Sequence, residues 1–217
     1  MQDRALVTRK SLLEAAAHLF VERGYAGTSI NDISSRSGKT SGAIYFHYSS
    51  KEKLALAVVR EQFATWPQLA RHCANPDVPP LEMLVALSFE IARALSEDVI
   101  ARAGARLWIE RRSIDAAVPA PFAAWIAAAT RLLADARAGG ELAEDVEPSD
   151  TATTLVCAFF GLCTLTGEVT GEGDLAARLH QWWLLALKAL QAQEEPAALI
   201  ARARARFSAD DPPAGAG

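Results

Sequence analysis

The sequence predicts an all-α protein, and three features of the chain carry that prediction. Apolar residues recur at three- and four-residue spacing along most of its length, which is typical of helices with one buried face. Alternating β-branched runs between turn residues, the pattern of strands, do not recur anywhere. Glycine or proline follows several of the periodic stretches, at points where a helix would end.

The first three expected helices span residues 8–23, 30–37 and 41–47. Gly24 follows the first of them. Thr28 is placed to cap the second, and Gly38 supplies the left-handed residue that stops it. Thr40 or Ser41 caps the third, which is only about two turns long.

Longer helices are expected over the rest of the chain, with prolines and a Gly-Gly pair between them. They span residues 50–70, 80–95, 98–114, 120–138, 148–170 and 174–192, and a shorter helix runs from 197 to 207. Residues 208–217 are rich in Pro, Gly and Asp, so we expect a disordered tail there.

Composition is that of an ordinary soluble globular protein, with 51% hydrophobic and 22% charged residues in 217. We expect no apolar run of membrane-spanning length and no membrane partner. The first ten residues lack the apolar region of a signal peptide, which favours a cytoplasmic location. Cys73, Cys157 and Cys163 form no C-x-x-C pair, so we interpret them as buried small hydrophobic residues.

Charge is unevenly distributed along the chain, although the net charge is −4. Residues 1–53 carry eight Lys or Arg against five Asp or Glu, a balance of +3. The remaining residues carry fourteen against twenty-one, a balance of −7. A basic head on an acidic body suits a protein that presents one end to phosphate.

The two short helices around Gly38 form a helix-turn-helix, in which the second helix enters the major groove of DNA. The residues expected nearest to base edges or at the DNA surface are Thr28, Lys39, Thr40, Ser41 and Gly42. Gly42 has no side chain and lets the helix approach the DNA closely. The segment Gly38-Lys39-Thr40 also imitates the end of a phosphate-binding loop, but the required first glycine would fall at Ile33.

Phosphate contacts are expected from Tyr45 and His47, on the outward side of the second short helix, and from Lys51, at the start of the next. Phe46 and Tyr48 are interpreted as core aromatic residues. The domains follow as a helix-turn-helix domain over 1–54 and a larger helical domain over 55–207.

Enzymatic activity is not expected, because no catalytic constellation stands out. The histidines share no metal-ligand spacing, and Ser88 lies in no G-x-S-x-G elbow. We therefore expect no bound metal and no cofactor.

Residues 9–54 resemble the N-terminal domain of TetR-family repressors, through AAAHLFVERGYAGTSINDIS and GAIYFHYSSKEKL. The resemblance implies that Tyr45, His47 and Lys51 contact the DNA backbone. Lys39 departs from the family pattern, which usually has a small apolar turn residue at this position. The resemblance implies a repressor that binds operator DNA as a homodimer.

The later segments ARAGARLWIERRSIDAAVPAPFAAW (101–125) and DTATTLVCAFFG (150–161) are similar to receptors for γ-butyrolactone-type signals, a TetR subgroup. The resemblance implies that Trp125 lines a ligand cavity and that Gln62 hydrogen-bonds the signal. Alanine-rich surroundings of Trp125 are also compatible with a cavity. The further pocket candidates are Phe89, Trp108, Phe160 and Thr164, for which spacing alone equally fits an ordinary core.

Two late helices, 148–170 and 174–192, are apolar on more than one side, which favours a partner subunit that covers them. We expect a ligand-responsive repressor that binds a pseudo-palindromic operator as a dimer. Its inducer would be a small signalling molecule such as a γ-butyrolactone, butenolide or furan. The alternative is a helical small-molecule-binding module that does not bind DNA.

Overall fold

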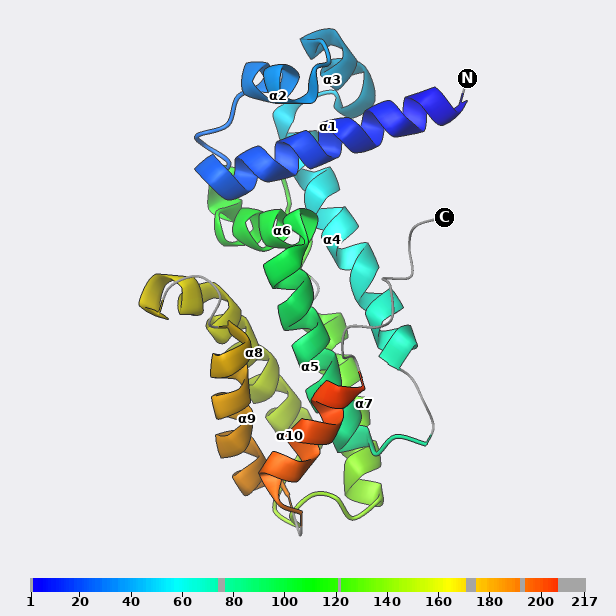
Figure 1. The fold of residues 1–217 in the computed structure, drawn as a ribbon, viewed down its shortest axis with the longest axis vertical. Helices are drawn as coiled ribbons and strands as arrows, with labels where there is room; N and C mark the ends of the chain where they lie inside the picture. The colour runs from blue at the N-terminus through cyan, green and yellow to red at the C-terminus, as the bar shows by residue number, and fades with distance from the viewer. Residues whose placement is uncertain (1, 74–76, 121, 171–174, 192–193, 207–217) are drawn as a thin grey trace. The chain divides into compact units, whose positions relative to one another are not determined.

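The computed structural model describes residues 2–73, 77–120, 122–170, 175–191 and 194–206, and its named elements are all helices (Figure 1). The helices are α1 (Gln2–Arg23), α2 (Ile30–Ser37), α3 (Ser41–Tyr48), α4 (Lys51–Cys73), α5 (Pro80–Glu97), α6 (Val99–Ile109), α7 (Phe122–Ala138), α8 (Pro148–Thr170), α9 (Leu175–Leu190) and α10 (Pro196–Ala205). A 3₁₀ turn spans Arg111–Ser113. The all-α prediction is confirmed.

Helix boundaries differ most from the prediction at the N-terminus, where α1 begins at Gln2 instead of residue 8. The described side chains of residues 5–7 are all exposed, so they present no buried face for a periodic pattern to reveal. The stretch predicted to end at 114 ends as an α-helix at Ile109. The predicted tail, 208–217, lies outside the described residues.

The chain divides into two compact units, and the first comprises Met1–Pro67 and Ala94–Ala120. Within it α1 packs against α2 and α6, while α2 packs against α3. Its core residues come from all of these helices and include Leu12, Phe20, Ile33, Ile44, Leu54 and Leu107. This unit therefore contains the expected DNA-binding domain together with most of α4, the end of α5 and all of α6.

The second unit comprises Gln68–Arg93 and Pro121–Gly217. In it α7 packs against α8, and α9 packs against both α8 and α10. Trp183 is at the centre of its core, and its indole N–H donates to the buried Ser88 hydroxyl at 2.8 Å. Arg202 of α10 and Arg206, the residue that caps its end, both donate to the buried carboxylate of Glu82, which fixes α10 on α5.

Two expectations about α8 are wrong. Cys157 is exposed and Cys163 is half-buried, whereas both were expected in the core; the side chain of Cys73 lies outside the described residues. The segment Pro148–Thr166 is also long and apolar enough to cross a membrane, by length and composition alone. Only 11% of it is buried.

Candidate nucleic-acid interface

Helix α2 begins with a capping box formed by Ser29 and Asp32. The Ser29 hydroxyl accepts the Asp32 amide at 3.1 Å, and the Asp32 carboxylate accepts the Ser29 amide at 2.8 Å. The Ser29 hydroxyl also donates to the Asp32 carboxylate, and this bond, followed by the one from the Ser29 amide, holds the pKa of the Asp32 carboxyl below its ordinary value. Gly38 ends the helix in the left-handed conformation with φ 65°, as predicted.

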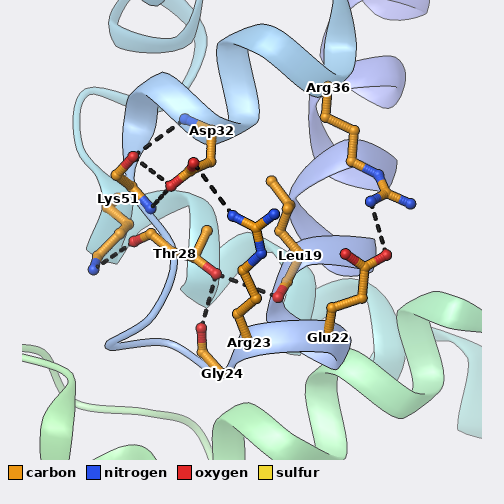
Figure 2. Close-up of polar contacts among 9 residues, drawn as sticks. Leu19, Glu22, Arg23, Gly24, Thr28, Asp32, Arg36 and Lys51 are labelled. Carbon is orange, nitrogen blue, oxygen red and sulfur yellow. Dashed lines mark hydrogen bonds and ion pairs between the residues drawn. The ribbon is translucent and has the colours of Figure 1, made fainter.

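Thr28 does not cap α2, because the cap is Ser29, one residue later. The Thr28 side chain is only 2% exposed, and its hydroxyl donates to the carbonyls of Gly24, at 2.8 Å, and Leu19 (Figure 2). Thr28 thus closes the turn after α1 and does not lie at the DNA-facing surface. A hydroxyl side chain does cap the start of α2, as predicted, but it belongs to Ser29 and not to its neighbour Thr28.

Two exposed ion pairs join α2 to α1 (Figure 2). Arg23 contacts Asp32 at 3.3 Å, and Arg36 contacts Glu22 at 2.7 Å. Exposed pairs of this kind contribute little stability individually, but both fix the same pair of helices. With the buried Ile33, they set the position from which α2 supports α3.

Helix α3 begins at the Thr40 cap, whose hydroxyl accepts the Ala43 amide at 3.2 Å. Ser34 of α2 donates to the Lys39 carbonyl at 2.6 Å, which ties the turn to the preceding helix. Ile44 and Tyr48 are buried and attach α3 to the core. The Tyr48 hydroxyl donates to the Arg9 carbonyl of α1 at 2.8 Å, so its interpretation as a core aromatic is confirmed.

Phe46 is not a core residue, contrary to the sequence interpretation, because its side chain is 83% exposed. Gly42, Tyr45 and Phe46 are all exposed and stand three and four residues apart in α3, so they lie on one outward side. His47 is half-buried and its ring lies edge-on to Phe46, with centroids 5.1 Å apart. Lys39 and Thr40 are exposed just before the helix begins, and Ser41 is half-buried.

Lys51, the first residue of α4, is anchored inside the head. Its ammonium donates to the carbonyls of Tyr25 and Thr28, both at 3.0 Å, and lies 4.1 Å from the centre of the Tyr25 ring. A lysine ammonium has three N–H donors, and the two carbonyls account for two of them.

A second set of polar contacts joins α6 to the end of α1, and sequence reasoning missed it. The Arg106 guanidinium donates to the Val21 carbonyl at 2.6 Å and to the Glu110 carboxylate at 2.9 Å. The same carboxylate accepts the backbone N–H of Tyr25. The residues stand 85 positions apart in the chain, and no local pattern could have connected them.

The residues expected to bind the ligand fall into separate groups. In the second unit Phe122 lies edge-on to both Trp125 and Phe160, at centroid distances of 5.4 and 5.2 Å. Phe122 was not among the sequence candidates. The Thr164 hydroxyl donates to the Phe160 carbonyl within α8, and the Phe89 ring lies under the Arg204 guanidinium.

Gln62 and Trp108 belong to the first unit. Gln62 is buried, and its side chain packs on the bare backbone of Gly104, where a Cβ atom would clash with the Gln62 side-chain amide oxygen. The Arg111 guanidinium covers the Trp108 ring at 3.9 Å. Among the described residues, no group of three or more His, Cys, Asp or Glu gathers in a way that could hold a metal ion.

Known proteins resemble this chain in both of its parts. Residues 12–58 match the family described as bacterial regulatory proteins, tetR family, and residues 78–192 match the tetracyclin repressor-like C-terminal domain. The A-factor receptor protein of Streptomyces griseus is 34% identical over 182 residues, which is 84% of this chain. The match spans 63% of that protein, so the chain covers less than two thirds of this relative's length.

Two solved structures share the fold at a similar level of identity. A γ-butyrolactone receptor described as an ArpA-like protein is 31% identical, with a TM-score of 0.77, and covers 94% of this chain and 99% of its own. CprB from Streptomyces coelicolor, solved in complex with its operator sequence, is 32% identical, with a TM-score of 0.77, over 94% of this chain and 98% of its own. With a helix-turn-helix head and matches that cover both parts of the chain, the protein belongs to the TetR family of bacterial regulatory proteins.

Proposed function

We propose that this protein is a ligand-responsive transcriptional repressor, not an enzyme, and that it acts in the cytoplasm. It binds a pseudo-palindromic operator as a dimer. The observation that carries the proposal is the outward side of α3, where exposed residues stand on a short helix capped at Thr40 and supported by α2. This is the arrangement by which a recognition helix enters the major groove. The likeness to CprB, solved with its operator, supports it.

In this proposal the residues before and at the start of α3 read base edges: Lys39, Thr40, Ser41 and Gly42. Tyr45, His47 and Lys51 bind phosphate oxygens, which set register rather than sequence. Because the Lys51 ammonium also holds the turn after α1, its loss would disturb the head as well as remove a phosphate contact.

Dimerisation is proposed through α8 and α9. The segment Pro148–Thr166 is strongly apolar yet little buried, and Leu165 and Leu185 are 59% and 70% exposed. A second copy of the chain would cover these side chains in an isologous four-helix arrangement. A bilayer would be the other apolar environment, but α9 carries no continuous basic face beside it.

The proposed inducer is a small signalling molecule of the γ-butyrolactone, butenolide or furan type, in line with the receptors that the chain resembles. Trp125, with Phe122 and Phe160 beside it, offers it an aromatic surface. Phe89 and Thr164 stay candidates for further contacts in the second unit, and Gln62 and Trp108 stay candidates within the first unit. Binding of inducer and of operator are then mutually unfavourable, and each weakens the other by the same factor.

The test begins with selection of duplexes from a random library by the wild-type protein, followed by gel-shift titration at several salt concentrations. The expected result is a selected inverted repeat, bound more weakly as salt rises, and released by a synthetic γ-butyrolactone. Leu165→Glu combined with Leu185→Glu should give a monomer in sedimentation. If the protein selects no duplex, the DNA-binding proposal is wrong, and the alternative of a helical ligand-binding module that does not bind DNA is left.

A further inference from the structure

Phe46 has the highest exposed fraction of the large apolar side chains reported for the described residues, although it lies on a short, well-anchored helix. Ile44 and Tyr48, two residues before and two residues after it in the same helix, are buried. The ring is therefore turned outward by the register of α3 and not by fraying of the helix.

The Phe46 ring has one described aromatic neighbour, the half-buried ring of His47, which lies edge-on to it at an interplanar angle of 84°. This contact gives the ring a preferred position and leaves most of its surface exposed. Covering a water-exposed phenyl ring with an apolar group is favourable, because it removes apolar surface from water. A molecule that binds α3 through an apolar group beside Phe46 would therefore bind more tightly.

Gly42 stands one helical turn before Phe46 on the same outward side. A Cβ atom at Gly42 would meet nothing closer than the Thr40 hydroxyl at 3.7 Å, so packing within the chain does not require a glycine there. Glycine also weakens a helix relative to alanine. The bare backbone beside an exposed ring thus fits a close approach from outside.

The proposed occupant of this side of α3 is the major groove, and the apolar group that a base pair presents there is the C5-methyl group of thymine. We infer that Phe46 contacts the methyl group of a thymine in each operator half-site, while Gly42 lets α3 come close enough for that contact. This inference rests on the proposed DNA binding and adds a specificity-determining residue to it. A protein partner that covered the ring instead would leave DNA recognition independent of Phe46.

The experiment removes the methyl group and the ring separately. In a duplex selected by the wild-type protein, each thymine is replaced in turn by uracil, which lacks only the methyl group. For wild type, affinity should fall roughly fourfold at one position in a half-site and roughly sixteenfold when both half-sites are changed, the effect of burying one methyl group each. Phe46→Ala should bind the thymine duplex more weakly and no longer distinguish thymine from uracil.

Two further variants make the result specific. Tyr45→Ala, on the same side of α3, should weaken binding to every duplex yet keep the preference for thymine. Phe46→Leu, which keeps an apolar side chain, should retain part of that preference. Phe46→Ala should melt at the wild-type temperature because the ring is exposed.

Selection of a clear operator by wild type, with the same thymine preference in Phe46→Ala, would overturn the role of Phe46 and leave DNA binding intact. Selection of no sequence by wild type would overturn both.

Discussion

The backbone N–H of Tyr25 donates to a carboxylate oxygen of Glu110 at 2.6 Å, across 85 positions of sequence. On its other side, the Tyr25 carbonyl accepts a hydrogen bond from Lys51 of α4, and its phenol donates to Glu52 at 2.9 Å. One residue in the turn between α1 and α2 is therefore bound to both α4 and α6. The turn that leads into the helix-turn-helix is thus attached to both of these helices.

Replacing Glu110 should destabilise the first unit. Glu110→Ala leaves the Tyr25 amide and the Arg106 guanidinium without this acceptor, which should cost about 1–3 kcal/mol of unfolding free energy. Denaturant unfolding measures it. The control is Glu14→Ala, whose exposed carboxylate makes only a 4.0 Å pair with Lys10 and should change stability little. Equal effects of the two variants would contradict a specific role for Glu110.

Gly24 should tolerate substitution less well than Gly38, although both have positive φ angles of 72° and 65°. A Cβ atom at Gly24 would come within 2.6 Å of the Glu110 carboxylate, whereas at Gly38 it would meet nothing within 4 Å. Gly38→Ala should therefore show only the cost of the left-handed conformation, roughly 1–2 kcal/mol, and Gly24→Ala should cost more. In a Glu110→Ala background the difference between the costs of Gly24→Ala and Gly38→Ala should shrink. Denaturant unfolding of the single and double variants, combined in a double-mutant cycle, measures this difference.

Acid should loosen the attachment of α10. Burial by itself would raise the pKa of Glu82, but hydrogen bonds from Arg202 and Arg206 outweigh it and hold the pKa below the ordinary value of 4.5. A lowered pKa in the folded state stabilises the protein above pH 4.5, and that contribution is lost as the pH falls further. Unfolding of wild type should thus become easier below this pH, while Glu82→Gln should lack this part of the dependence.

Glu141 provides an internal comparison of opposite sign. Burial raises the pKa of this carboxyl, so its ionisation in the folded state is unfavourable and stability falls as the pH rises through the ordinary value. Glu141→Gln should remove that loss. The pH prediction fails if Glu82→Gln and Glu141→Gln change the stability profile in the same direction.

The buried hydrogen bond between Trp183 and Ser88 should contribute to the second unit. Ser88→Ala removes the acceptor of the indole N–H inside the core, at an expected cost of about 1–3 kcal/mol. Tryptophan fluorescence during denaturation follows the change. In a Trp183→Phe background, which has no such donor, Ser88→Ala should cost clearly less; an unchanged cost would show that the serine acts through packing alone.

Helix positions and the caps at Gly38 and Thr40 could be predicted from the sequence because the signals are local. Gly38 and Thr40 act over three or four residues, and their roles emerge as expected. Phe46 could not be placed correctly, because in a helix of only eight residues an apolar residue on the functional side has the same pattern as one in the core. The Glu110 contact depends on how α6 folds back onto α1, which no short-range pattern encodes.

The first compact unit is made of two separate stretches of chain, with Ala94–Ala120 added to the N-terminal segment. A graft of the DNA-reading module onto another sensor, cut after residue 54, would therefore carry α2 and α3 but leave behind the helix that covers α1. Leu107, buried in the shared core, would be lost with it. Chimeric regulators built from this protein should transfer both stretches together, which makes the module a discontinuous unit of exchange.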